Sequence, residues 1–193
     1  MIIDSHCHLT YEPMSKSLHE TIERAKREGV KYILTISTED KSFDKILKIV
    51  EEHKSVYGTY GIHPHEAKLH QYVKSKDIIN RINQNKKIIG IGETGLDFYY
   101  NHSEKKDQIC SFEEHISAAQ EKNLPLIVHT RSAENETLEI LKRYSKIKDT
   151  KILIHCFTGT REFAFKLIDL GAYISASGVV TFNKSQELAN TFK

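Results

Sequence analysis

Two histidines one residue apart close the first apolar run of this chain, which reads IIDSHCHL over residues 2–9. Side chains at positions i and i+2 of a strand point to the same face, so His6 and His8 can converge on one point if the strand persists that far. Imidazole is a common ligand of divalent metals such as zinc, nickel and iron. The pair therefore suggests half of a metal site, although two surface histidines would give the same pattern.

Other polar residues close later apolar runs at the same relative place, namely His63, His65, Glu93, His129 and His155. Histidines on either side of a carboxylate form a ligand set for two ions, because a carboxylate can bridge metals about 3.5–4 Å apart. We expect His6 and His8 to hold one ion and Glu93 to lie between the two. The second ion would take His129 and His155. Two such ions would activate a water molecule for hydrolysis near neutral pH.

Each expected ligand also has a plain structural interpretation. A histidine at a strand end, such as His129 or His155, is often a hydrogen-bonded core residue, and Glu93 can be an ordinary paired carboxylate. The recurrence of these residues at equivalent places favours the metal site.

Three further residues are candidates for contact with a substrate. His63 and His65 flank Pro64, where they would bind substrate or transfer a proton, or would simply form a turn. Arg131 lies two residues beyond His129 and can hold a phosphate with a bidentate pair of hydrogen bonds. A surface salt bridge is the alternative for this arginine.

The apolar runs that carry these residues have the length of strands and are separated by amphipathic helical stretches. Their content of Ile, Val and Tyr without clean alternation is typical of strands buried on both faces of a parallel sheet. Strands are expected at 1–4, 30–37, 56–63, 87–93, 124–130, 151–157 and 171–178. Helices are expected around 18–25, 43–50, 103–123, 138–144 and 163–167. Five histidines outside the strand ends are expected at the solvated surface, namely His19, His53, His70, His102 and His115.

This alternation predicts an α/β fold of repeated βα units. An open doubly wound sheet would spread the strand-end residues along one edge, whereas a (β/α)8 TIM barrel brings them to one mouth. Their shared placement favours the barrel.

The composition sets limits on the class of protein. A chain of 193 residues with 39% hydrophobic and 28% charged residues is typical of a single globular domain over 1–193. The net charge of +2 is too small for a broad nucleic-acid-binding face. Three cysteines without CxxC spacing favour reduced thiols, and no run approaches the ~20 apolar residues of a membrane span. We expect a cytoplasmic protein with no membrane association and no stable protein partner.

Six motifs in order give the chain a resemblance to a known family over its whole length. They are DSHCHL, GIHPH, IGETGLDFYY, PLIVHTRSA, HCFTG and ASGVVTF. Together they closely resemble the TatD family of metal-dependent deoxyribonucleases, which are amidohydrolase-like TIM barrels. The resemblance implies hydrolysis of phosphodiester bonds in DNA with two divalent ions of magnesium, manganese or zinc.

The resemblance also implies roles for individual residues. The positions that match the family's metal ligands are His6, His8, Glu93, His129 and His155. Glu93, His63 and His65 become candidates for catalysis, and Arg131, His63 and His65 become candidates for binding the substrate.

The chain departs from the family at its carboxyl end. The family's last metal ligand is an aspartate at the end of strand eight, and only about seven βα units can be counted here. We therefore expect strand eight and the last helix to be absent, which would leave strands one and seven as open edges. Asp97, expected in the loop after strand four, and Asp169, expected within a helix, do not take the place of that aspartate.

Two other functions stay open from the sequence. One is a related amidohydrolase that acts on amides, esters or lactones. Many such enzymes carry a carboxylated lysine after strand four, where this chain has Glu93. The other is a truncated, inactive form of the nuclease that binds metal or nucleic acid only weakly.

Overall fold

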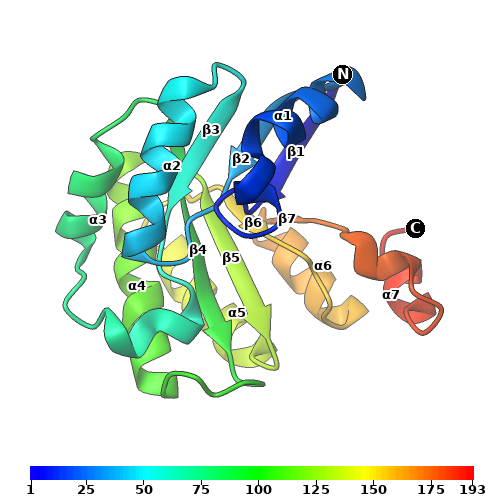
Figure 1. Cartoon of the computed structure of the whole chain (residues 1–193). Coiled ribbons are helices and arrows are strands. Elements are labelled where there is room, and N and C mark those ends of the chain that lie inside the picture. Colours follow the sequence, from blue (N-terminus) through cyan, green and yellow to red (C-terminus); the bar gives the residue numbers. More distant parts are fainter.

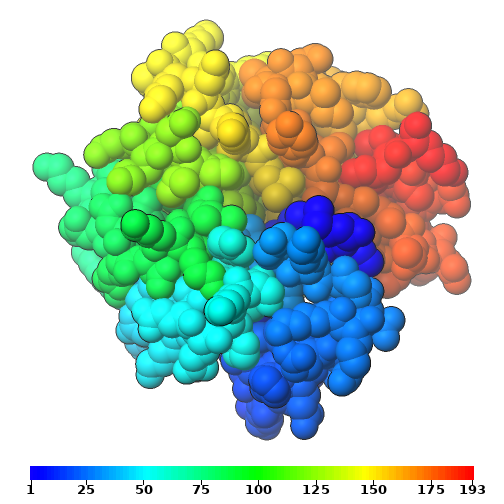
Figure 2. Space-filling model, turned by 90° about the horizontal axis from the view of Figure 1, so that it is seen from above, coloured from blue at the N-terminus to red at the C-terminus, as the bar shows by residue number.

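The computed structural model describes all 193 residues and contains one curved sheet of seven parallel strands (Figure 1). The strands lie in the order β1-β2-β3-β4-β5-β6-β7, and every neighbouring pair is parallel. The strand order of a doubly wound sheet reverses at a switch point. In a TIM barrel, by contrast, neighbouring strands lie in the same order as in the chain. Figure 2 shows the segments following one another around the molecule in chain order. The expected TIM-barrel type of α/β fold is therefore confirmed, with seven strands and with β1 and β7 as the sheet edges.

All seven expected strands are present, although β6 and β7 are shorter than expected. Their bounds are β1 Ile2–Cys7, β2 Val30–Thr35, β3 Val56–Tyr60, β4 Ile88–Asp97, β5 Leu126–Arg131, β6 Ile152–Ile154 and β7 Tyr173–Ile174. The expected helices are α1 Leu18–Arg27, α2 Asp40–Glu52, α4 Lys105–Lys122, α5 Glu134–Ser145 and α6 Arg161–Asp169. Two short helices were not expected, α3 Ser75–Ile82 and α7 Gln186–Thr191, because about two turns give too few apolar positions to show a period. Three 3₁₀ turns complete the fold, η1 Met14–Ser17, η2 Pro64–Leu69 and η3 Gly178–Thr181.

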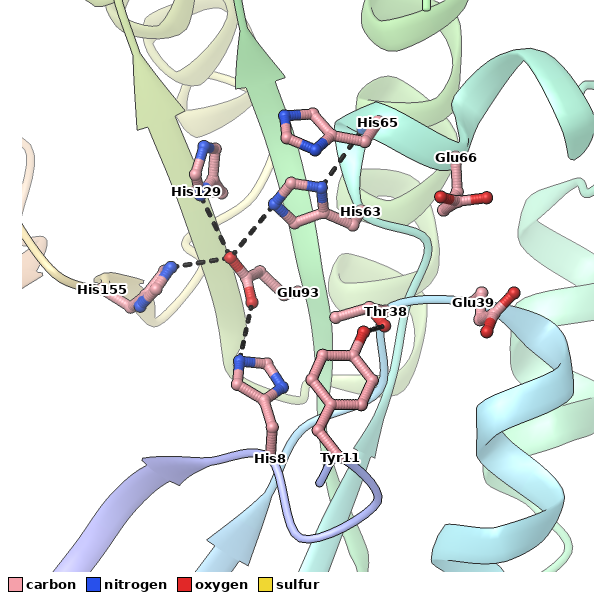
Figure 3. A pocket seen from close by; sticks show the side chains of 10 residues that line it. All are labelled: His8, Tyr11, Thr38, Glu39, His63, His65, Glu66, Glu93, His129 and His155. Atoms are coloured by element: carbon pink, nitrogen blue, oxygen red, sulfur yellow. Dashed lines mark hydrogen bonds and ion pairs between the residues drawn. The ribbon is translucent and has the colours of Figure 1, made fainter. Parts of the chain in front are cut away.

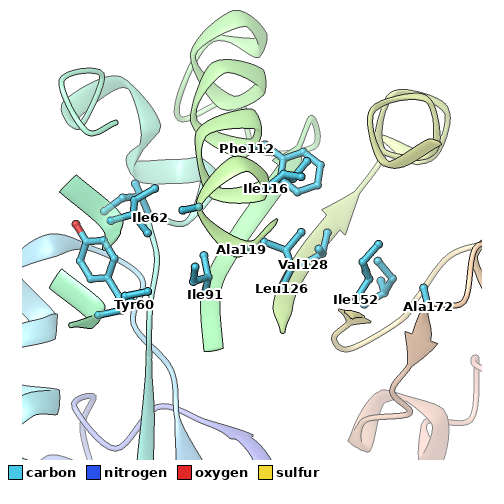
Figure 4. Packing of buried hydrophobic residues seen from close by; sticks show 14 of the residues in the cluster. Tyr60, Ile62, Ile91, Phe112, Ile116, Ala119, Leu126, Val128, Ile152 and Ala172 are labelled. Atoms are coloured by element: carbon cyan, nitrogen blue, oxygen red, sulfur yellow. The ribbon is translucent and has the colours of Figure 1, made fainter. Parts of the chain in front are cut away.

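The hydrophobic core lies between the sheet and the helices that cover its outer face. Figure 4 shows Phe112 and Ile116 of α4 packed beside Leu126 and Val128 of β5. All four side chains are at most 1% exposed. Each such side chain stabilises the fold by about 1.5–3 kcal/mol relative to an exposed one. The packing holds the strands rigidly, so the residues at their carboxyl ends are held in fixed positions. None of the helices combines the length and the apolar character needed to cross a membrane.

The expectation that His115 lies at the solvated surface is wrong. Its side chain is 1% exposed on the inner face of α4, Nε2 accepts the backbone N–H of Ile62, and Nδ1 donates to the carbonyl of Ser111. His70 is also buried, and it bonds the carbonyl of Glu66. The sequence did not reveal the bond between His115 and Ile62 because these two residues lie 53 positions apart. The remaining three histidines of that group are exposed or only partly buried.

The buried His115 makes stability depend on pH. Burial lowers the pKa of His115 from 6.5 to about 4, so the folded chain keeps this ring neutral where the unfolded chain protonates it. Its contribution to stability is therefore full above pH 6.5 and declines as the pH falls from 6.5 to about 4, by roughly 3 kcal/mol in total. Urea unfolding of the natural chain and of His115→Gln between pH 4 and 8 measures this difference. An identical pH slope in both chains would contradict the assignment.

Candidate metal centre

The carboxyl ends of four strands bring the expected ligands to one place. His6 lies in β1 and His8 just after it, Glu93 and His129 lie in β4 and β5, and His155 directly follows β6. Glu93 is 3% exposed and forms the centre of the group (Figure 3). Its carboxylate oxygens lie 2.7 Å from His155, 3.1 Å from His129, 3.4 Å from His6, 3.5 Å from His63 and 3.7 Å from His8. The convergence that the strand-end positions predict is present.

On one side of Glu93, the donor atoms of His6, His8 and Glu93 all lie within 4.8 Å of one another, as metal ligation requires. Both ring nitrogens of His6 and Nδ1 of His8 are buried without a hydrogen-bond partner. A buried polar atom left without a partner costs about 1–3 kcal/mol. Nε2 of His6 is the unpartnered atom that faces Glu93, and an ion bound between these three residues would satisfy it, so the donor set fits a divalent metal.

On the other side of Glu93, His129 and His155 approach the same oxygen, Oε1. Nε2 of His129 lies 3.1 Å from Asp97 Oδ2 and Nδ1 lies 3.1 Å from Glu93 Oε1, so each ring nitrogen faces a carboxylate oxygen. Nε2 of His155 lies 2.7 Å from Glu93 but makes no aligned hydrogen bond. The ring of His155 also stacks on His6, with centroids 3.9 Å apart. The second set of donor atoms that lie within 4.8 Å of one another consists of His63, Glu93 and His129, and His155 is not part of it.

His63 meets the distance criterion for a ligand beside His129 and Glu93, but its hydrogen bonds give it another role. It caps the amino end of η2, where Pro64 takes the first position and Nδ1 of His63 accepts the backbone N–H of His65 at 3.2 Å. A neutral ring that accepts at Nδ1 carries its hydrogen on Nε2, the nitrogen that faces Glu93. A protonated nitrogen donates a hydrogen bond and does not bind metal. His63 is therefore a donor to the pocket.

Burial and the central carboxylate set the charges of the group. Burial alone would raise the pKa of Glu93, but its contacts with His129, His155 and His6 outweigh it and hold that pKa well below the usual range. Burial lowers the pKa of His63 to about 3, and it also lowers the pKa values of His8 and His155. Burial thus favours the neutral form of His63, His8 and His155, the protonation state in which imidazoles bind metals.

His129 titrates in the opposite direction. Burial lowers its pKa, but the hydrogen bonds to Glu93 and Asp97 outweigh burial and raise it above 6.5. In the metal-free site the raised pKa favours the protonated form of His129, and a bound ion would displace that proton.

Asp97 is the site residue that the sequence interpretation misplaced. It is the last residue of β4 and not part of the following loop, because the strand continues four residues beyond Glu93. The side chain is 1% exposed, and Oδ2 accepts from Nε2 of His65 at 2.9 Å and from Nε2 of His129 at 3.1 Å. Leu96, an apolar residue next to Asp97, was the available signal that the strand continues. Asp169 ends α6, within a helix as expected.

The pocket above Glu93 has a volume of about 390 Å³ and includes residues that the sequence analysis did not single out. The hydroxyl of Tyr11 lies 2.5 Å from that of Thr38, and the Tyr11 ring stacks on His8 with centroids 5.2 Å apart. Thr38 closely follows β2, so it occupies another strand end and could have been found by the same reasoning. The added lining residues are Tyr11, Thr38, Glu39 and Glu66 (Figure 3).

Arg131 lies at the rim and not in the pocket. It ends β5, and its guanidinium carbon Cζ lies 4.0 Å from the ring centroid of Tyr99 and 4.6 Å from that of Tyr100. It takes part in none of the ion pairs of the structure, so the salt-bridge alternative does not apply.

Comparison with known proteins decides the family. The family described as "TatD related DNase" matches residues 3–193. The chain belongs to the TatD family. YcfH of Escherichia coli, named an uncharacterized metal-dependent hydrolase, is 38% identical over 190 residues, which cover 97% of this chain and 70% of YcfH. A hydrolase of Buchnera aphidicola with the same description is 36% identical over 200 residues, which cover 100% of this chain and 75% of the relative.

Solved structures agree with this assignment. The crystal structure of the TatD homologue YjjV from E. coli superposes with a TM-score of 0.89 at 26% identity, covering 98% of this chain and 73% of YjjV. The phosphotriesterase homology protein of E. coli, solved with phosphate in its active site, shares the fold at a TM-score of 0.67 and 17% identity. This TatD-family protein is therefore a metal-dependent hydrolase with a TIM-barrel-like fold.

Proposed function

We propose that this TatD-family hydrolase cleaves phosphodiester bonds in DNA, using two divalent ions that share Glu93. The observation that carries the proposal is the position of Glu93, a buried carboxylate with unpartnered imidazole nitrogens on one side and two further imidazoles on the other. The family description, TatD related DNase, supports DNA as the substrate.

The residues that would hold the ions divide into two groups around Glu93. His6 and His8 would hold one ion. His129, through Nδ1, and His155, through Nε2, would hold the other. Magnesium, manganese and zinc are the candidates, and the imidazole-rich donor set favours zinc. When bound, such ions lower the pKa of water and polarise a phosphoryl oxygen.

The remaining side chains of the pocket supply directed hydrogen bonds. His63 donates from Nε2 to an anionic oxygen of the substrate, because its Nδ1 is occupied by the backbone of His65. Asp97 holds Nε2–H of His65, which leaves Nδ1 of that ring free to accept a proton. Asp97 accepts hydrogen bonds from both His65 and His129. This one carboxylate therefore orients the metal ligand His129 and the proton acceptor His65 together.

The direct test is cleavage of a single-stranded DNA oligonucleotide by the purified chain with added manganese, magnesium or zinc. We expect products that disappear with a chelator and return when the ion is restored. Binding of metal without cleavage of DNA would overturn the nuclease proposal. Hydrolysis of a lactone, ester or amide in place of DNA would favour the amidohydrolase alternative.

Replacing Asp97 by asparagine is expected to weaken metal binding about 10- to 100-fold, the usual effect of removing a partner that orients a ligand. An amide oxygen is a weaker acceptor than a carboxylate and cannot hold two ring N–H groups equally well. Calorimetric titration of the metal-free protein with zinc measures the change. Asp169→Asn, on the exposed end of α6, is the matched control, and equal affinity in both variants would contradict the role of Asp97.

A further inference from the structure

Beside the metal centre lies an aromatic platform, formed by Tyr99, Tyr100 and Arg131, that the proposed reaction does not use. The guanidinium of Arg131 lies over both tyrosine rings, at 4.0 and 4.6 Å from their centroids. The two rings meet edge to face, with centroids 4.9 Å apart. Tyr99 is 59% exposed and Tyr100 is 49% exposed, so a large part of this aromatic surface faces solvent.

The aromatic platform is attached to the catalytic pocket. Oδ1 of Asp97 accepts the backbone N–H groups of Tyr99 and Tyr100, while Oδ2 holds His65 and His129. The ring of Tyr100 lies 5.5 Å, centroid to centroid, from that of His65, which lines the pocket. Because one buried carboxylate fixes both the loop and the histidines, the aromatic platform has a defined position next to the reacting groups.

Packing does not explain these residues. Neither tyrosine belongs to the hydrophobic core, and neither hydroxyl makes a hydrogen bond within the chain. The charge of Arg131 is not neutralised by any ion pair. A guanidinium whose face lies on aromatic rings keeps its N–H edge available, and that edge matches the oxygens of a phosphate. Partly exposed tyrosine side chains beside an unpaired arginine are features by which proteins hold a base and its phosphate.

We propose that the aromatic platform stacks a nucleobase of the nucleotide adjoining the scissile phosphate, while Arg131 contacts a neighbouring phosphate. This inference rests on the proposed function, because it assigns a recognition element to the same site. Stacking needs only the flat face of a base, so the aromatic platform should favour a nucleotide that has a base over one that lacks it, with little preference among the four bases.

The test uses short single-stranded oligonucleotides with one cleavable phosphodiester and with a base or a tetrahydrofuran abasic residue on either side of it. For the natural chain we expect kcat/KM to fall about tenfold when the base on one side is removed. Tyr100→Ala should cleave the base-bearing substrate about tenfold more slowly and the abasic substrate at an unchanged rate. Tyr100→Phe should keep the preference, and Tyr173→Ala, at an exposed tyrosine of β7, is the matched control.

The outcomes separate the two proposals. Cleavage of base-bearing and abasic substrates at equal rates by the natural chain would contradict the proposed role of the aromatic platform. It would leave the proposed nuclease function unaffected. If Tyr100→Ala lost the same share of kcat/KM on both substrates, the tyrosine would only support the structure. That result would also contradict the proposed role of the aromatic platform. Cleavage of neither substrate by the metal-loaded natural chain would refute the proposed function itself.

Discussion

Replacing Glu93 by glutamine is expected to reduce hydrolysis at least about a thousandfold and to remove most of the bound metal. Glutamine has nearly the same shape but no charge, and its single amide group is a poor ligand for a cation. Five histidine side chains lie within 3.7 Å of the carboxylate, and none of them can replace it as a negative ligand. The substitution therefore affects both proposed ions together, whereas loss of a single histidine affects one.

Metal content per chain, measured by mass spectrometry, and kcat/KM on an oligonucleotide test this expectation. Circular dichroism establishes that the variant is folded. Glu139→Gln makes the same chemical change at an exposed position of α5 and should retain both metal and activity. A Glu93→Gln chain that binds the full complement of metal and turns over normally would show that the carboxylate is not shared.

Replacing Gly95 by alanine is expected to destabilise the fold by about 3–5 kcal/mol, a large part of the stability of a typical domain. Gly95 lies in β4 with φ +133°, a conformation that side chains rarely adopt. A Cβ atom at this position would lie 2.0 Å from the backbone oxygen of His129. Since both strands are held by the core, the collision can be relieved only by separating β4 from β5, which would displace Glu93 from His129.

Gly29→Ala separates the two causes. Gly29 also has a positive φ, +87°, but a Cβ atom there would have no neighbour within 4 Å. This control should lose about 1 kcal/mol from backbone conformation alone. Urea unfolding gives both values. Similar losses in the two variants would show that the close approach of the strands at Gly95 contributes nothing beyond the backbone angle.

The parts of the site that were correctly predicted depend on local patterns. Apolar runs of strand length alternate with helical periods, and the residue that closes each run must lie at the mouth of a parallel barrel. His6, His8, Glu93 and His129 could therefore be placed together without any knowledge of distances. The short helix α3 was missed for a related reason, since eight residues give too weak a period to stand out.

The parts that were missed depend on contacts between distant segments. Asp97 seemed to lie in a loop, and only its bonds to His65 and His129, each 32 positions away, show that it organises the site. His115 was expected at the surface, but its Nε2 accepts the backbone N–H of Ile62, which lies 53 positions away in the chain.

The sequence by itself determined the family, the βα repeat and the strand-end residues, because residue type and spacing along the chain are local properties that a one-dimensional pattern records. The tertiary structure alone decided which nitrogen of each imidazole faces Glu93. That choice made His63 a donor and placed Nδ1 of His129 against Glu93. It also placed Arg131 on Tyr99 and Tyr100. The physical reason is that protonation states and ring orientations are set by partners brought together only when the sheet curves.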